Sequence, residues 1–83
     1  GKVLVDFFAT WCGPCSMMAP VLEQVSDITP DVKIVKVDID ENPELAERYK
    51  VMSIPTFMVF ENGTVVKKTV GAISKSELLE LIG

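Results

Sequence analysis

The pattern of apolar and polar residues changes period along the first half of the chain, and each change predicts a new element. Residues 3–8 are a nearly continuous apolar run, which is typical of a strand covered on both faces. From residue 14 to residue 28, apolar side chains recur every three or four positions, which predicts a helix that buries one stripe. Residues 32–38 alternate and predict a second strand. These three elements in this order form a right-handed parallel crossover.

Pro20 lies within the predicted helix of residues 14–28. Proline has no backbone N–H, and its ring presses against the preceding turn. We therefore expect one helix with a kink at this position, and not two separate helices.

The second half of the chain predicts a short helix, a hairpin and a final helix. Asn42-Pro43 reads as a helix cap followed by proline at the first helical position,. Residues 56–60 and 64–70 read as strands on either side of Asn62-Gly63, a dipeptide that accepts positive φ at both positions,. Ser74 to Glu77 is a capping-box sequence before an apolar helix,. The predicted order is β-α-β-α-β-β-α.

The length and composition indicate a single globular domain over residues 1–83. The chain is 48% hydrophobic and 24% charged, which is ordinary for a folded protein. Folding a chain of this size removes only about 60% of the surface that the unfolded chain exposes, so there is no room for a second core.

The charge balance argues against several classes of partner. Eight basic and twelve acidic residues give a net charge of −4, and no basic run is longer than Lys67-Lys68. We therefore expect no nucleic-acid partner, because such binding neutralises phosphates with clustered Lys and Arg. The apolar stretches are shorter than the roughly 20 residues of a membrane helix, and the N-terminal residues lack the order of a signal peptide. We expect no membrane partner and a cytoplasmic location.

The candidate chemistry is concentrated in one motif. The chain has no histidine, which excludes mechanisms that need an imidazole base. Both cysteines occur in Trp11-Cys12-Gly13-Pro14-Cys15, where the first strand meets the first helix. A thiolate at a helix N-terminus is stabilised by unpaired backbone N–H groups and the helix dipole, so we expect Cys12 to attack. Cys15 lies on the same helix face and serves as the resolving thiol. We expect Gly13 to permit a tight turn and Pro14 to fix φ at the helix start.

Two other uses of a Cys-x-x-Cys pair are weaker. A structural disulfide normally closes a long loop, whereas a two-residue spacer constrains almost nothing. A structural zinc site needs four ligands, so two thiolates would require a second subunit. The pair next to a βαβ pattern therefore favours redox chemistry, and we expect no metal site.

The motif is part of a longer set of residues that resembles one family. The matching residues are Asp6 to Cys15 (DFFATWCGPC), Pro20, Val37 to Asp40, Asn42-Pro43, Ile54-Pro55-Thr56, Phe60, Asn62-Gly63 and Val70-Gly71-Ala72. In these residues the chain resembles the thioredoxin family over nearly its whole length. The resemblance implies an α/β, thioredoxin-like fold with a central mixed four-stranded sheet flanked by helices. The strand and helix that usually open the family's fold are missing.

The resemblance assigns roles to further residues. Asp6 is the one charged residue in an apolar strand, and burial raises the pKa of a carboxyl,. In the family the matching acid assists proton transfer at the resolving cysteine, and Lys36 matches the lysine beside that acid. Without the resemblance, Lys36 is equally well interpreted as a solvated strand lysine.

The resemblance also implies a surface for clients around Cys12. The family's proline at Pro55 follows a cis peptide bond, lies against the cysteines and exposes the backbone of the preceding residue for pairing with a client segment. Local rules alone predict a trans bond here, because cis bonds are a small minority even before proline. The resemblance places Trp11, Ile54, Gly71 and Ala72 on this flat apolar surface, with Gly13 and Pro14 beside them.

The chain departs from the family pattern at three places. The missing opening strand leaves one sheet edge uncovered, and uncovered edges invite association. We expect a protein that folds with reduced stability and is a monomer or a weak dimer formed by edge pairing. Phe8 stands where many family members have a second Trp, and Ser16 stands where a basic residue is common.

The function implied by the resemblance is that of a protein dithiol-disulfide oxidoreductase, an enzyme that donates electrons to client disulfides in cell redox homeostasis. No bound cofactor is implied. The implied partners are a thioredoxin reductase and clients such as ribonucleotide reductase, peroxiredoxins and methionine sulfoxide reductases. Alternatives are a thiol oxidase or isomerase, a non-catalytic binding module, and a metal or iron–sulfur site shared by two subunits. Gly13-Pro14 argues against the oxidase, because those relatives often carry His between the cysteines.

Overall fold

Four strands and four helices make up the chain, and the computed structural model describes all residues from 1 to 83. The elements are β1 (Lys2–Phe8), α1 (Gly13–Met17), α2 (Ala19–Ile28), β2 (Val32–Asp38), α3 (Pro43–Arg48), β3 (Thr56–Glu61), β4 (Thr64–Val70) and α4 (Lys75–Ile82). Each predicted strand and helical segment is present, although the one helix predicted over residues 14–28 is divided into α1 and α2.

The strands form one mixed sheet in the order β2-β1-β3-β4. β1 pairs with β2 in parallel, and β3 pairs antiparallel with both β1 and β4. The expected mixed four-stranded sheet with a parallel β1–β2 pair is therefore confirmed. β1 and β3 lie in the centre of the sheet, while β2 and β4 are its edges.

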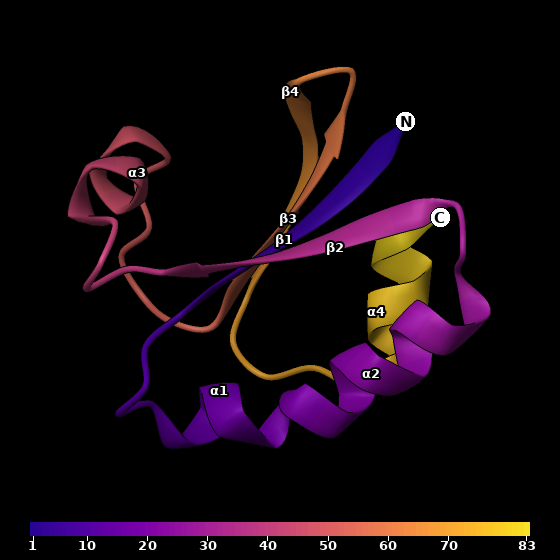
Figure 1. The fold of residues 1–83 in the computed structure, drawn as a ribbon, viewed down its shortest axis with the longest axis horizontal. Helices are drawn as coiled ribbons and strands as arrows, with labels where there is room; N and C mark the ends of the chain where they lie inside the picture. The colour runs from indigo at the N-terminus through magenta and orange to yellow at the C-terminus, as the bar shows by residue number, and fades with distance from the viewer.

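The main core lies between the sheet and three helices. Figure 1 shows α1, α2 and α4 on one face of the sheet and α3 on the other face, near one end. Alternate residues of β1 and β3 pack against the three helices and form a core of eight side chains: Leu4, Met18, Leu22, Val25, Phe57, Val59, Leu78 and Ile82. Burial of each such side chain contributes about 1.5 to 3 kcal/mol. This core anchors β1, which ends at Phe8, three residues before the cysteine motif begins at Trp11.

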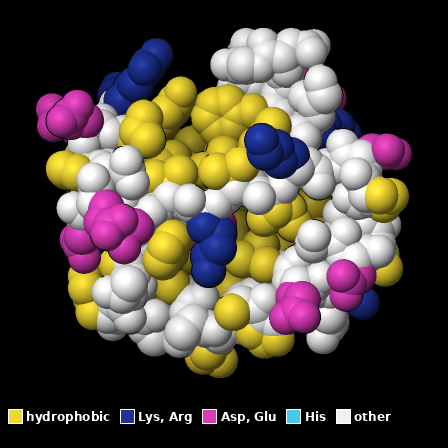
Figure 2. Space-filling view, viewed as in Figure 1, with side chains coloured by type: hydrophobic (Ala, Val, Ile, Leu, Met, Phe, Trp, Pro, Cys, Tyr) yellow, Lys and Arg dark blue, Asp and Glu magenta, His cyan; other side chains and the backbone are white.

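The other face of the sheet is only partly covered. Val5, Phe7 and Met58 form a small core there, and the ring of Tyr49 stacks edge-on against Phe60 at 5.4 Å between centroids. Beyond this core an apolar hollow of about 300 Å³ is open, and Figure 2 shows a broad apolar area between α3 and the β3–β4 hairpin. No strand pairs with the outer edge of β2.

The structure corrects the prediction for the helix that contains Pro20. In place of one kinked helix there are two, α1 and α2, separated at Met18. Pro20 has no N–H to donate to the carbonyl of Ser16, so the regular ladder is interrupted two residues before the proline. Met18 keeps right-handed helical angles, φ −80 and ψ −14, and α2 follows directly.

The predicted turn and caps are largely confirmed. Asn62 and Gly63 both have positive φ, 52° and 82°, as the hairpin turn requires. Ser74 and Glu77 form the complete capping box of α4. Asn42 is the N-cap residue of α3, but its side chain makes no capping bond. Its amide instead donates to the Asp38 carbonyl oxygen at 3.2 Å, which corrects that part of the prediction.

Candidate functional site

Cys12 and Cys15 lie at the start of α1, after the loop that follows β1. They form a disulfide in which the two Cα atoms are 5.2 Å apart. Cys12 is the N-cap residue of α1, with an extended backbone at φ −88 and ψ 110. Its Sγ accepts a hydrogen bond of 3.2 Å from the Cys15 backbone N–H. An N–H aimed at this sulfur stabilises negative charge on it, so the geometry suits a thiolate at Cys12 once the disulfide is reduced.

Gly13 and Pro14 open α1 in different ways. Pro14 occupies the first turn of the helix, where a missing N–H costs little, as expected. Gly13 is exposed and has no positive φ, and a Cβ added to it would meet no atom within 4 Å. The tight turn that we expected Gly13 to permit therefore involves no positive φ at this glycine.

Two loops from distant parts of the chain border the disulfide. The Ile54–Pro55 peptide bond is cis, as the resemblance implied, and the Ile54 carbonyl oxygen lies 3.9 Å from the Cys12 Sγ. Gly71, at φ 98°, donates its N–H to the Pro55 carbonyl oxygen at 2.8 Å. The cysteine motif, the loop before β3 and the loop after β4 are thereby brought together. Ala72 follows Gly71 and is exposed.

Trp11 is held beside this site by a residue that the sequence reasoning left without a role. The indole is 70% exposed, and its Nε1 donates a hydrogen bond of 2.7 Å to Oδ2 of Asp40. Trp11 follows β1 and Asp40 follows β2, and the carboxyl ends of parallel strands meet at one edge of a sheet. That topological rule was the available signal for Asp40.

A second exposed apolar side chain, close to the site in sequence, was also missed. Met52 is 92% exposed and precedes Ile54 by two residues. The loop around it has no periodic pattern, so only its nearness in sequence to the Ile54-Pro55 motif pointed to it.

Asp6 lies on β1 beneath the helices, directly opposite Lys36 of β2 in the parallel register. The side chain is 1% exposed, and its Oδ1 has no hydrogen-bond partner. Burial raises the pKa of this carboxyl to about 6, against a smaller lowering by the Lys36 charge. A carboxyl with such a pKa gains and loses its proton close to neutral pH.

The Lys36 ammonium does not pair with Asp6. The single ion pair within 4.0 Å in the protein joins Lys2 and Glu61. The Lys36 Nζ lies 4.7 Å from the centroid of the Phe8 ring instead. Phe8, Lys36 and Cys15 together line a hollow of about 260 Å³, so this lysine and the second cysteine share one cavity.

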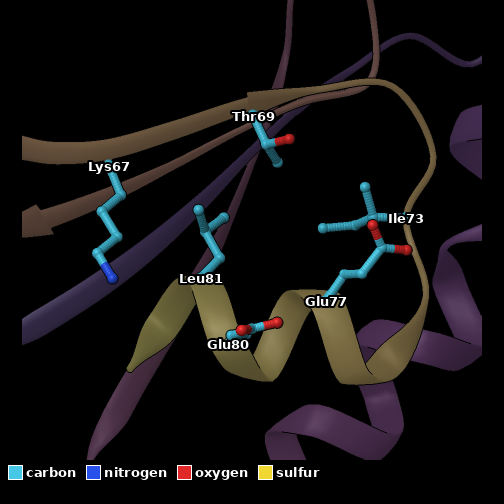
Figure 3. A pocket seen from close by; sticks show the side chains of 6 residues that line it. All are labelled: Lys67, Thr69, Ile73, Glu77, Glu80 and Leu81. Carbon is cyan, nitrogen blue, oxygen red and sulfur yellow. The ribbon is translucent and has the colours of Figure 1, made fainter.

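The other hollows are not lined by either cysteine. Figure 3 shows the one between β4 and α4, of about 340 Å³, with Lys67 on the strand and Glu77 and Glu80 on the helix. Glu77 is engaged in the capping box with Ser74, which also lowers the pKa of Glu77. No cluster of three or more His, Cys, Asp or Glu side chains comes together as a metal site. None of the helices is long and apolar enough to cross a bilayer.

Comparison with known sequences matches the whole chain to a single family. The family model described as thioredoxin matches residues 1–83. The thioredoxin of Chlamydia trachomatis serovar D is 52% identical over 82 residues, which are 99% of this chain and 80% of that protein. The thioredoxin of Staphylococcus aureus strain Mu50 is 53% identical over 83 residues, again 99% of this chain and 80% of that protein.

Solved structures agree with the sequence relatives. The oxidised mitochondrial thioredoxin 3 of Saccharomyces cerevisiae superposes with a TM-score of 0.92 at 42% identity, covering 98% of this chain and 76% of the other. The Fasciola hepatica thioredoxin gives a TM-score of 0.92 at 42% identity, covering 98% and 77%. These likenesses confirm the expected thioredoxin-like fold. Disulfide-bearing proteins are accordingly its clients, and the chain belongs to the thioredoxin family of dithiol-disulfide oxidoreductases.

Proposed function

We propose that Cys12 is the attacking thiol and Cys15 the resolving thiol of this oxidoreductase. The Cys12 thiolate attacks one sulfur of a client disulfide, so that a mixed disulfide forms and one client thiolate leaves. The Cys15 thiolate then attacks the Cys12 sulfur, which closes the Cys12–Cys15 disulfide and releases the second client thiolate. Two electrons pass from the protein to the client. The observation that carries this assignment is the Cys15 N–H directed at the Cys12 Sγ at 3.2 Å.

Asp6 exchanges the proton of Cys15 in this scheme, and Lys36 adjusts the acidity of Asp6. Cys15 must lose its proton before it attacks the mixed disulfide, and a neighbouring base with a pKa near the working pH is suited to accept it. The support is the raised pKa of Asp6, at about 6, with Lys36 as the opposing charge. Lys36 and Cys15 line the same cavity, which supports a connection between the acid–base pair and the second thiol.

The client segment binds across the loops that border Cys12. The Ile54 backbone pairs with an extended segment of the client, in the manner of an added strand. Trp11, Pro14, Pro55 and Ala72 flank this position, while Gly13 and Gly71 leave it open. Support comes from the closeness of the Ile54 carbonyl oxygen to the Cys12 Sγ, 3.9 Å, and from the exposure of Trp11.

Trapping with single-cysteine variants tests the order of the two thiols. With Cys15→Ser, we expect a stable mixed disulfide between Cys12 and a protein client, since the resolving step is lost. The matched variant Cys12→Ser should trap none. Equal trapping by both variants would contradict the assignment, because it would mean that either sulfur attacks.

The equilibrium reduction potential of the pair tests the direction of electron flow. We expect a value on the reducing side of the glutathione pool, because electrons then flow outward to client disulfides. A value on the oxidising side would identify an oxidase or isomerase instead.

The partners and place of action follow from a reducing role. We propose that a thioredoxin reductase re-reduces this protein. We propose that its clients include ribonucleotide reductase, peroxiredoxins and methionine sulfoxide reductases, and that it acts in the cytosol, where thiols are kept reduced. A related chain, 41% identical, comes from a structural study of thiol resolution in a yeast mitochondrial 1-Cys peroxiredoxin through glutathione and thioredoxin systems, which supports the peroxiredoxin class. Turnover with purified reductase and each client is the direct test, and a client that stays oxidised is removed from the set.

We propose that residues 1–83 act as one domain and associate weakly through the β2 edge. The shared helix-covered core, with contributions from β1, α2, β3 and α4, supports the first statement. The unpaired outer edge of β2 and the apolar hollow beside it support the second,.

A further inference from the structure

Lys36 has two competing places for its ammonium group, and the structure holds it at one of them. Asp6 and Phe8 lie two residues apart on the same face of β1, since successive side chains of a strand alternate. Lys36 stands opposite Asp6 in the register, so its long side chain is within reach of both. The Nζ rests 4.7 Å from the Phe8 ring centroid, and the Asp6 Oδ1 is left without a partner.

This arrangement is unusual for a buried carboxyl beside a lysine. A buried charge is normally paired, because an unpaired one loses its hydration without compensation. Here the side chain of Asp6 is 1% exposed, while the cation of Lys36 lies over the π face of an aromatic ring. The face of an aromatic ring attracts a cation, so Phe8 competes with Asp6 for the same ammonium group.

We propose that Phe8 is a positioning residue that holds the Lys36 ammonium out of ion-pair distance of Asp6, and so keeps this carboxyl available for proton exchange. Phe8 and Lys36 also line the hollow that reaches Cys15. The ring therefore fixes the cation at the wall of that hollow rather than on the acid. The proposal deepens the proposed role of Asp6 and rests on it.

Among the residues around Asp6, Lys36 is the charged one that affects the Asp6 pKa. From β3 the residue opposite Asp6 is Phe57, which carries no charge. On β1 itself the neighbours on the same face are Leu4 and Phe8. From α1 the titratable group at the cavity is Cys15, which is in the disulfide. The Asp6 pKa accordingly responds to burial first and to Lys36 second, with no other charged group contributing.

Removing the ring should let the lysine close on the acid. In Phe8→Leu the ammonium loses its aromatic partner, and the ionised Asp6 lies directly opposite Lys36 in the strand register. An opposite charge at contact distance lowers the pKa of a carboxyl by 1 to 3 units in proteins generally, and we expect a fall of about one unit here because Lys36 already acts from farther away. Phe8→Tyr keeps an aromatic face and should leave the Asp6 pKa unchanged.

The experiment is an NMR titration of the Asp6 side-chain carboxyl carbon in the oxidised protein. We would compare the unmodified chain, Phe8→Leu and Phe8→Tyr, each with Lys36 and with Lys36→Met. Phe60→Leu is the matched control, since it removes a half-buried aromatic ring from the opposite face of the sheet. We expect Phe8→Leu to lower the midpoint only when Lys36 is present. If Phe8→Leu does not fold, Phe8→Met replaces it.

Two results would overturn the proposal. One is an unchanged Asp6 midpoint in Phe8→Leu. The other is an equal fall with and without Lys36, which would mean that the ring only keeps water away from Asp6. The titration reports on Asp6 itself and not on turnover. A separate measurement tests the proposed role of Asp6, because Asp6→Asn would leave the resolving step at full rate if that role is wrong. The titration still tests the role of Phe8 in that case.

Discussion

The indole Nε1 of Trp11 and the carboxylate Oδ2 of Asp40 are joined by a hydrogen bond of 2.7 Å between residues 29 positions apart. This bond anchors a largely exposed ring beside Cys12 at the edge of the sheet where β1 and β2 both end. A large side chain that is held in place loses little entropy when a client covers it, so a tethered indole is a better contact than a free one.

Replacing Trp11 should affect large substrates more than small ones. With Trp11→Ala we expect reduction of the insulin disulfides to slow by about tenfold, the effect of losing roughly 1.4 kcal/mol of binding. Reduction of a small aromatic disulfide should change little, because such a substrate does not cover the ring. The two rates are measured side by side under the same reductant, and equal slowing would remove the docking role.

Asp40 should act only through the indole. Asp40→Ala frees the ring, and we expect a smaller loss on protein disulfides than in Trp11→Ala, of the order of threefold for about 0.6 kcal/mol. Asp40→Asn keeps an oxygen acceptor and is the matched control. In a Trp11→Ala background, Asp40→Ala should have no further effect. A further loss there would show that Asp40 contacts clients itself.

The buried Asp6 should make the stability of the fold depend on pH. Its pKa is raised from 3.8 to about 6, so the folded state holds the proton more tightly than the unfolded state. The free energy of unfolding therefore falls as the pH rises from about 4 to about 6 and is level above that range. Asp6→Asn should abolish this fall and gain about 2 to 3 kcal/mol at pH 7, taking about 1.4 kcal/mol per pKa unit. Urea unfolding at pH 4 and pH 7 measures both effects, and a gain of the same size at the two pH values would contradict this origin.

The core between the sheet and α4 should dominate stability. Leu78 is completely buried, and Leu78→Ala should cost about 2 to 5 kcal/mol through lost burial and the cavity left behind. Leu45 of α3 is 36% exposed, so Leu45→Ala should cost distinctly less. Chemical denaturation of the two variants gives the comparison. Equal losses would mean that α3 is as integral to the core as α4.

The open edge of β2 should lead to association at high concentration. Val35 of β2 lies at the hollow on the uncovered face, together with Val3, Val5 and Phe60. We expect sedimentation equilibrium to detect a weak dimer, and Val35→Lys to weaken it by placing a charge beside the edge. Val66→Lys, on the opposite edge strand β4, is the control. A protein that stays monomeric at millimolar concentration would rule out this dimer.

The sequence predicted those parts of the fold that depend on local spacing. The capping box of Ser74 and Glu77, the turn at Asn62-Gly63 and the positions of the four strands along the chain all follow from periodicity and backbone preference, and all are confirmed. The cis bond before Pro55 is different, because local preference favours trans, and only the likeness to a family indicated it. The break at Met18 and the free Asn42 side chain show how an exact hydrogen-bond pattern escapes such reasoning.

Contacts at the site were less predictable because they result from a choice between partners. Lys36 had both a carboxylate and an aromatic ring within reach, and no pattern in the sequence says which it takes. Trp11 and Asp40 meet only once the parallel pairing of β1 and β2 is known. Spacing therefore located the two thiols, whereas the residues that adjust and orient them required the tertiary structure.

The hydrogen bond from the Gly71 N–H to the Pro55 carbonyl ties the loop before β3 to the loop after β4. A client segment that presses on one loop is consequently resisted by both, and the border of the site behaves as one stiff rim. In the binding mode proposed above, the main chain of an extended client segment would pair with the Ile54 backbone at this rim, so recognition would depend on the shape of the segment more than on its side chains. Breadth of substrate choice would then be a property of the backbone at this rim.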